Sequence, residues 1–265
     1  MSQTANDTLR DGKPKRRIIF YSHDTFGLGH LRRSRALAAA LTAGDDNASA
    51  IILTGSPVAG RFTFPKGVDH IRLPGVTKLA DGSYVSQTLG LDIDEITALR
   101  AGLIKTAIEK YEPDLLIVDK EPSGFRGELL PSLEWLRDHG NTKTVLGLRD
   151  VLDEPEVLAA EWARKGAIAA TEAFYDEIWV YGVHDVYDPT KGLPLSEAAR
   201  DRMHWTGYLR RETTDEVDLP DHPYVLITPG GGGDGAAMVS LVLEAYEKDP
   251  DLSPNAVLIY GPFLS

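Results

Sequence analysis

Residues 17–41 read RIIFYSHDTFGLGHLRRSRALAAAL, and this stretch decides the fold. Its first six residues form a short apolar run, which is typical of a buried parallel strand. A loop with two glycines follows, and residues 31–41 are rich in alanine, with leucines at helical spacing. Residues 50–53 are apolar again. The order of strand, loop, helix and strand predicts a βαβ unit.

The same alternation continues along the chain. Apolar runs and helical periodicity predict strands at 115–118, 144–148, 177–181 and 203–206, and helices at 93–111, 129–138 and 155–170. Strands that alternate with helices favour right-handed crossovers and a parallel sheet. We therefore expect an α/β fold.

The expected helix 93–111 carries the clearest local signals. Asp92 and Glu95 have the spacing of a capping box at its start. Its expected buried face consists of Ile96, Leu99, Leu103, Ile104, Ala107, Ile108 and Tyr111. The preceding residues 74–90 have no strong period, so we expect a loop there.

Composition and pattern divide the chain into parts. Residues 1–14 are polar and aperiodic, which predicts a disordered tail. A first domain is expected over 15–209, and a linker over 210–222, which are charged and contain Pro220. The pattern restarts in residues 223–265, with strands at 224–228 and 256–260 around a helix at 236–247. One βαβ unit cannot bury both faces of its sheet. It is therefore expected to be the truncated beginning of a second domain, to dock on the first domain, or to pair with another chain, which leaves a homo-oligomer open.

The formal charge of −12, from 40 acidic and 28 basic residues, argues against nucleic-acid binding. One basic run, Lys13, Lys15, Arg16 and Arg17, is expected to be a solvated edge, with peripheral contact to anionic lipid as the alternative. The chain has no cysteine and no apolar stretch near the ~20 residues that span a bilayer. Its first residues lack the apolar core of a secretion signal. We expect a cytoplasmic location.

The first glycine loop, residues 25–30, joins the first strand to its helix, where an anionic group is favoured. Its dinucleotide fingerprint is incomplete, because Arg32 stands where the third glycine would fall. The second strand ends in Thr54-Gly55, with no acidic residue for a ribose. NAD is therefore not expected.

The second glycine loop, residues 228–235, also joins a strand to a helix. It lacks the Lys-Ser/Thr of a Walker loop, which argues against ATP hydrolysis. Its glycines suit a diphosphate, and the alternative is a flexible turn. The expected diphosphate contacts are Gly230, Gly231, Gly232, Gly233, Asp234 and Gly235.

Residues 23–34, HDTFGLGHLRRS, resemble the opening motif of GT-B glycosyltransferases. They are most similar to family 28, the relatives of the lipid-linked N-acetylglucosaminyltransferase of peptidoglycan synthesis. The second glycine loop, followed by residues 259–263, is similar to the start of that family's donor domain. The resemblance covers residues 17–265 and implies two Rossmann-like domains, the first facing the acceptor and the second binding the nucleotide-sugar. The family's base-reading segment lies further into the donor domain, beyond residue 265.

The resemblance implies transfer of a hexosyl or N-acetylhexosaminyl group from a nucleotide-sugar, with UDP favoured, to an unknown sugar or lipid-linked acceptor. No Asp-x-Asp with a supporting histidine is present, so we expect neither a metal nor a cofactor. A glycine loop and a helix N-terminus can stabilise the leaving phosphate instead. The alternatives are a hydrolase resembling the UDP-sugar hydrolase of pseudaminic acid synthesis, a sugar-nucleotide 2-epimerase, and an inactive binding remnant.

His30 is the candidate base, because an imidazole titrates near neutral pH. His23 is the rival base, and the alternative role of His30 is to cap the helix or to bind an acceptor phosphate. Asp119 is expected to orient His30 from the carboxyl edge of the sheet, where such folds bind ligands. The expected acceptor-binding residues are Gly27, Gly29, Arg32, Arg149, Asp150 and Glu121. For the charged residues at the sheet edge, the alternative is a structural ion pair.

Overall fold

The computed structural model describes residues 9–10, 13–14, 16–23, 28–79, 83–210, 218, 220–230 and 235–262. The chain divides into two compact units. One contains the large sheet and ends at Arg210, and the other contains the residues beyond Arg210 together with the short segment at Leu28 and Gly29.

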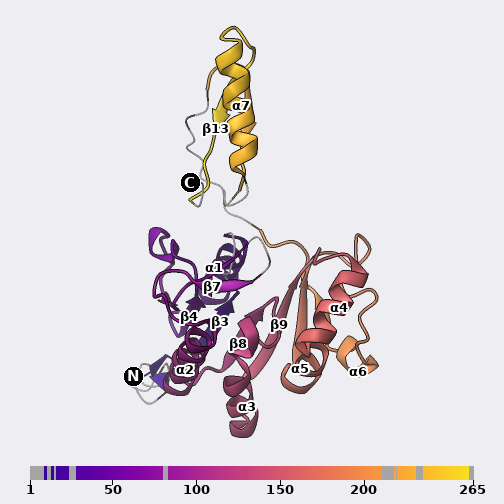
Figure 1. Ribbon diagram of the computed structural model, residues 1–265. Coiled ribbons are helices and arrows are strands. Elements are labelled where there is room, and N and C mark those ends of the chain that lie inside the picture. Colours follow the sequence, from indigo (N-terminus) through magenta and orange to yellow (C-terminus); the bar gives the residue numbers. More distant parts are fainter. Residues whose placement is uncertain are drawn as a thin grey trace. The chain divides into compact units, whose positions relative to one another are not determined.

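A seven-stranded sheet organises the first unit (Figure 1). Its strands are β3 (Arg16–Ser22), β4 (Ala48–Thr54), β5 (Val68–Arg72), β8 (Leu115–Asp119), β9 (Lys143–Arg149), β10 (Glu177–Tyr181) and β11 (Met203–Trp205). Their order is β11-β10-β9-β8-β3-β4-β5, and every neighbouring pair is parallel. The expected α/β fold with a Rossmann-like parallel sheet is confirmed. The strand order reverses between β3 and β8, which makes their carboxyl ends the topological switch point.

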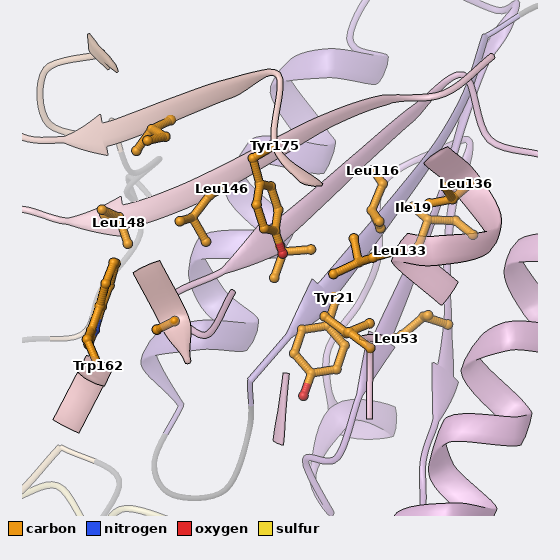
Figure 2. Close-up of a cluster of buried hydrophobic side chains, with 14 of the residues drawn as sticks. Ile19, Tyr21, Leu53, Leu116, Leu133, Leu136, Leu146, Leu148, Trp162 and Tyr175 are labelled. Atoms are coloured by element: carbon orange, nitrogen blue, oxygen red, sulfur yellow. The ribbon is translucent and has the colours of Figure 1, made fainter. Parts of the chain in front are cut away.

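Helices cover both faces of this sheet. They are α1 (Gly29–Thr42), α2 (Ile93–Tyr111), α3 (Leu130–His139), α4 (Pro155–Lys165), α5 (Ala167–Phe174) and the short α6 (Glu197–Arg200). Leu31 and Ala38 of α1 pack on one face, against a cluster that includes Ile18 and Ile117. Helices α2 to α5 pack on the other face, where Tyr21, Leu116, Leu133, Trp162 and Tyr175 are among the buried side chains (Figure 2).

The capping box predicted for α2 is present. Asp92 accepts a hydrogen bond from the Asp94 backbone N–H, and Glu95 accepts one from the Asp92 backbone N–H. The single helix expected over 155–170 is instead two helices. Gly166 has a φ of 64° and ends α4, because glycine takes this left-handed conformation without steric cost.

The buried face of α2 corrects the sequence pattern. Leu99 and Leu103 are 43% and 42% exposed, while Arg100 is buried. Arg100 lies in one row with Ile96 and Ile104, at a spacing of four residues, and Glu128 neutralises its charge. A pattern built on apolar residues alone misses such a paired buried cation.

Arg17 is a second buried cation, so the basic run is not wholly a solvated edge. Its side chain is 2% exposed and its guanidinium lies 3.4 Å from Glu112 and 5.9 Å from the Tyr111 ring centre. Arg16, next to it, is 65% exposed and pairs with Asp45.

Residues 74–90 are not an irregular loop, as expected, but hold an antiparallel hairpin of β6 (Val76–Lys78) and β7 (Tyr84–Ser86). Val76 packs in a small buried cluster with Ile96 and Phe125. The Tyr84 ring meets the Phe125 ring edge-on at 4.9 Å. These tertiary contacts stabilise the hairpin, and they cannot be recognised in its short, weakly alternating sequence.

The expected disordered tail also contains paired strands, β1 (Leu9–Arg10) and β2 (Lys13–Pro14). The sequence between them is Asp11-Gly12, a dipeptide that favours two-residue hairpins, and this signal was missed. The other residues up to position 12 lie outside the described ones.

The second unit is a βαβ element of β12 (Tyr224–Ile227), α7 (Ala236–Lys248) and β13 (Asn255–Leu258), whose two strands are parallel. Of the expected linker, residues 211–217 and 219 lie outside the described part of the chain. Many large apolar side chains of this unit are exposed: Val225, Leu226, Met238, Leu241, Leu243, Ile259 and Tyr260. Across the described residues of both units, the helices are too short or too polar to span a membrane.

Candidate active site

The candidate site lies at the switch point of the sheet. Helix α1 begins at Gly29, shortly after β3, and places His30 in its first turn. Strand β8 pairs directly with β3 and ends at Asp119. Two residues that are 89 positions apart in the sequence therefore meet at one sheet edge.

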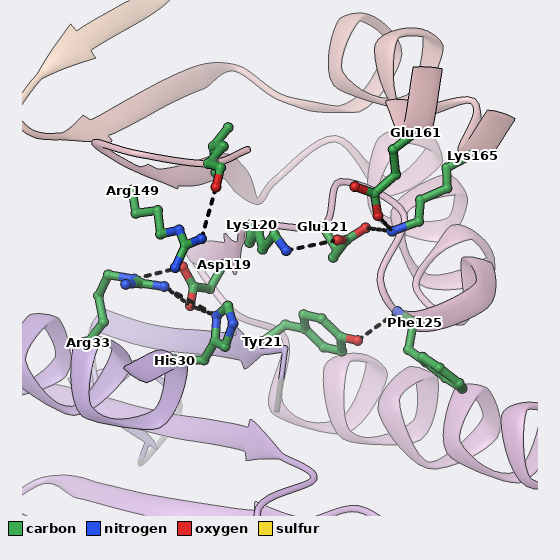
Figure 3. A network of polar contacts seen from close by, with 11 residues as sticks. Tyr21, His30, Arg33, Asp119, Lys120, Glu121, Phe125, Arg149, Glu161 and Lys165 are labelled. Carbon is green, nitrogen blue, oxygen red and sulfur yellow. Dashed lines mark hydrogen bonds and ion pairs between the residues drawn. The ribbon is translucent and has the colours of Figure 1, made fainter. Parts of the chain in front are cut away.

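His30 and Asp119 are joined by a short contact, with 2.7 Å between Nδ1 and Oδ2 (Figure 3). Arg33, one turn further along α1, donates from Nε to Oδ1 and from Nη2 to Oδ2 of Asp119, each at 2.9 Å. The Asp119 side chain is 5% exposed and the side chains of His30 and Arg33 are each 16% exposed. The three groups form one largely buried network that still reaches the surface.

Asp119 is held as a carboxylate. Burial alone would raise the pKa of Asp119, but the hydrogen bond from His30 and the charge of Arg33 outweigh it and hold the pKa below its ordinary value. A carboxylate accepts hydrogen bonds only, so His30 donates from Nδ1. The neutral ring then keeps its lone pair on Nε2, which is the arrangement that a general base needs.

His23 lies beside this network. Its ring centre is 5.8 Å from that of His30, in an edge-to-face arrangement, and the residue is 8% exposed. Burial, together with the nearby His30, lowers the pKa of His23 well below its usual range. Its Nδ1 is buried, and none of the described residues bonds to it.

The lowered pKa of His23 predicts acid sensitivity of the fold. Below about pH 6.5 the unfolded chain takes up a proton that the buried His23 does not, so stability is complete above this pH and falls as the pH decreases. The lowered pKa of Asp119 acts in the same direction below its unfolded value near 3.8. The urea midpoint should drop between pH 7.5 and 5.5 in the wild-type protein, and drop less in His23→Phe.

His184 provides the control, because its side chain is 65% exposed. His184→Phe should keep the pH dependence of the wild-type protein. An equal drop in the wild-type protein and His23→Phe would show that His23 is not the group responsible.

The other predicted edge residues are placed around the network but are not bonded to it. Among the described residues, no hydrogen bond or ion pair joins Arg32, Arg149, Asp150 or Glu121 to His30 or Asp119. Arg32 is exposed on α1, and Arg149 donates to the Leu152 carbonyl at 3.0 Å. The Asp150 side chain accepts from the Val151 backbone N–H.

Glu121 forms a structural ion pair, which was the alternative expected for the charged residues at the sheet edge. It is buried, and its carboxylate lies 2.9 Å from Lys165 Nζ and 3.7 Å from Lys120 Nζ. Lys165 also pairs with Glu161 at 2.6 Å, so the cluster is extended toward α4 (Figure 3).

Two residues of the site were not assigned from the sequence. Arg33, rather than Arg32, faces Asp119, and its i+3 spacing from His30 was the available signal. Tyr181 ends β10, and its ring centre is 5.8 Å from the guanidinium carbon of Arg33. Burial, and then the charge of Asp119, raises the pKa of Tyr181.

Residues 25–27 of the first glycine loop and 231–234 of the second lie outside the described residues, and with them the predicted contacts Gly27, Gly231, Gly232, Gly233 and Asp234. Gly29 is exposed, with open space around it. Gly230 has a φ of 67°, which favours glycine. A Cβ on Gly235 would lie 2.1 Å from the Pro229 side chain, so this glycine is required by its neighbour.

Histidine, aspartate and glutamate side chains do not gather into a group of three or more suited to a metal ion anywhere in the described residues.

The chain is similar in fold to solved structures of two glycosyltransferases. A glycosyltransferase from Rickettsia africae ESF-5 gives a TM-score of 0.52 at 12% identity, covering 93% of this chain and 60% of that one. CalG4, the calicheamicin glycosyltransferase, gives 0.50 at 14% identity, covering 95% and 67%. The chain thus spans about 60% and 67% of their lengths. No protein-family model and no curated protein sequence matches it. At this identity the likeness establishes a shared GT-B-like fold.

Proposed function

We propose that the protein is a glycosyltransferase that moves a sugar from a nucleoside-diphosphate sugar to an acceptor hydroxyl, with His30 as the base. The observation that carries the proposal is the His30–Asp119 contact at the switch point of the sheet. The fold shared with glycosyltransferases supports it. The likeness of residues 23–34 to family 28 favours a relative of the peptidoglycan enzyme.

The proposed reaction follows from the direction of the hydrogen bond between His30 and Asp119, which leaves the lone pair of the imidazole on Nε2. His30 Nε2 takes the proton of the acceptor hydroxyl while the oxygen of that hydroxyl forms a bond to the anomeric carbon of the donor sugar. The bond from that carbon to the diphosphate oxygen breaks, and the diphosphate leaves with the electron pair. Asp119 stabilises the imidazolium, because an opposite charge in hydrogen-bond contact favours the protonated ring.

We assign the diphosphate to the second glycine loop and the N-terminus of α7, without a metal. Backbone N–H groups and the helix dipole favour negative charge there. This gives residues 15–209 to the acceptor and 223–265 to the donor, with a UDP-linked hexose or N-acetylhexosamine as the preferred donor. The acceptor would be a sugar or a lipid-linked sugar, and the reaction would take place in the cytoplasm.

The test is nucleoside-diphosphate release from a panel of UDP-, GDP-, dTDP- and ADP-sugars, measured by chromatography. The protein should be used at the full length that its cells produce, with a membrane extract of those cells as the source of acceptor. We expect release from one donor class, dependent on the extract and unchanged by EDTA. Release without the extract, with free sugar as the product, would favour the hydrolase. A protein that neither binds nor cleaves any donor would contradict the proposal.

A further inference from the structure

The carboxylate of Asp119 contacts both Arg33 and His30. The inference from this arrangement rests on the proposed function, in which His30 is the base. Arg33 occupies both oxygens of Asp119 through two 2.9 Å hydrogen bonds. His30 contacts only Oδ2, at 2.7 Å. Arg33 therefore fixes the carboxylate plane and decides which oxygen faces the imidazole.

Arg33 also lies close to the imidazole itself, with 3.2 Å between Nη2 and His30 Nδ1. In a pair of histidine and aspartate alone, the carboxylate would strongly favour the imidazolium. Here a fixed positive charge lies 3.2 Å from the same ring nitrogen that the carboxylate oxygen contacts at 2.7 Å, and it disfavours a second positive charge on the ring. Among the described residues, the charged or titratable groups in contact with His30 are Arg33 from α1, Asp119 from β8 and His23 from the segment after β3. His23 is itself held neutral by burial.

The position of Arg33 is supported from the other side by Tyr181. The guanidinium carbon lies 5.8 Å from the centre of the Tyr181 ring, within the range of a cation–π contact. The Tyr181 hydroxyl fills the space above Gly147, where a Cβ would lie 2.1 Å from it. Gly147 pairs with Asp119 in the sheet, so the absence of a side chain at Gly147 leaves room for the Tyr181 ring beside the Arg33 guanidinium.

We propose that Arg33 is a positioning residue that regulates the base. It holds Asp119 in the orientation that presents Oδ2 to His30, and its positive charge opposes a second positive charge on the imidazole. Nε2 is then more available for the acceptor's proton than in a pair of histidine and aspartate alone. Arg33 does not touch the reacting atoms in this role, because it acts through Asp119 and through its charge.

The test follows the His30 ring by NMR in histidine-labelled protein, with the signal assigned by its loss in His30→Gln. In Arg33→Gln the titration midpoint of His30 should rise by at least about one pH unit, since Asp119 then acts on the ring without a compensating cation. Arg33→Lys keeps the charge and should return most of the way to the wild-type midpoint. Arg32→Gln is the matched control, because Arg32 is exposed on the same helix. It should leave the midpoint unchanged.

The corresponding kinetic readout is the acidic limb of the kcat/KM profile against pH. In Arg33→Gln the pH midpoint of this limb should rise by the same amount as the NMR midpoint, and the activity should recover at high pH. A uniform loss of activity at every pH, without a moved limb, would indicate a merely structural role. Equal midpoints in Arg33→Gln, Arg32→Gln and the wild-type protein would overturn the inference. The NMR titration needs no turnover, so a protein without transferase activity would count against the proposed function alone.

Discussion

Turnover should fall by about 10²–10⁴-fold when His30 is replaced by alanine, which is the range expected for loss of a general base. The acceptor hydroxyl would then have no group to take its proton during sugar transfer. The measurement is kcat with the donor identified by the panel of nucleotide-sugars. The loss should fall mainly on kcat, because a proton acceptor stabilises the transition state more than the bound substrates.

The fold should survive this substitution, since Asp119 keeps both of its hydrogen bonds from Arg33. Circular dichroism and the urea midpoint check this point. His184→Ala removes an exposed histidine and should leave kcat at the wild-type value. Retained turnover in His30→Ala would remove His30 from the mechanism and direct attention to His23.

Glu128→Ala should destabilise the first unit by about 3–5 kcal/mol, the range for a buried ion pair that loses one partner. Arg100 donates to Glu128 from Nε and Nη2, each at 2.6 Å, and both side chains are at most 2% exposed. The Tyr21 hydroxyl also donates to Glu128, at 2.8 Å. Without the carboxylate, Arg100 would remain as a buried and uncompensated charge. The free energy of unfolding in urea measures the effect.

The double variant Arg100→Met with Glu128→Leu separates this charge effect from lost packing. Apolar residues of similar volume often replace a buried ion pair without loss, so the double variant should be far more stable than Glu128→Ala. Asp46→Ala is the surface control. It removes the exposed pair with Lys66 and should not change the midpoint measurably. A Glu128→Ala midpoint equal to that of Asp46→Ala would contradict the prediction.

The sheet was predictable because its central strands are continuous apolar runs closed by polar loops. The nearness of His30 and Asp119 followed from the same reasoning, since Asp119 ends one such strand and His30 begins the helix after the loop that follows the neighbouring strand. The prediction of Arg32 in place of Arg33 overlooked the i+3 spacing that puts Arg33 on the same helix face as His30. The ion pair of Glu121 is equally invisible in the sequence, since Lys165 comes from a helix 44 positions away.

Other features were missed because their local signals are weak. Strand β5 lies at the edge of the sheet, and only Val68 of its five residues is buried. The β6–β7 hairpin has three residues in each strand and depends on Phe125 and Ile96 from elsewhere in the chain. In α2, Arg100 breaks the apolar stripe, and its partner Glu128 lies 28 positions further on. Tertiary contacts decide all of these features.

The strand order also has a consequence for how the chain folds. Strands β3, β4 and β5 are consecutive along the chain and form one half of the sheet, and β8 to β11 form the other half. Each half can form through local crossovers, but joining them closes a loop of some ninety residues, since the Arg17 N–H meets Asp114 across 97 positions. Pairing over such a separation is slow, because the chain entropy is lost before the contact forms. His30 and Asp119 belong to different halves, so their contact marks the moment at which the sheet becomes complete.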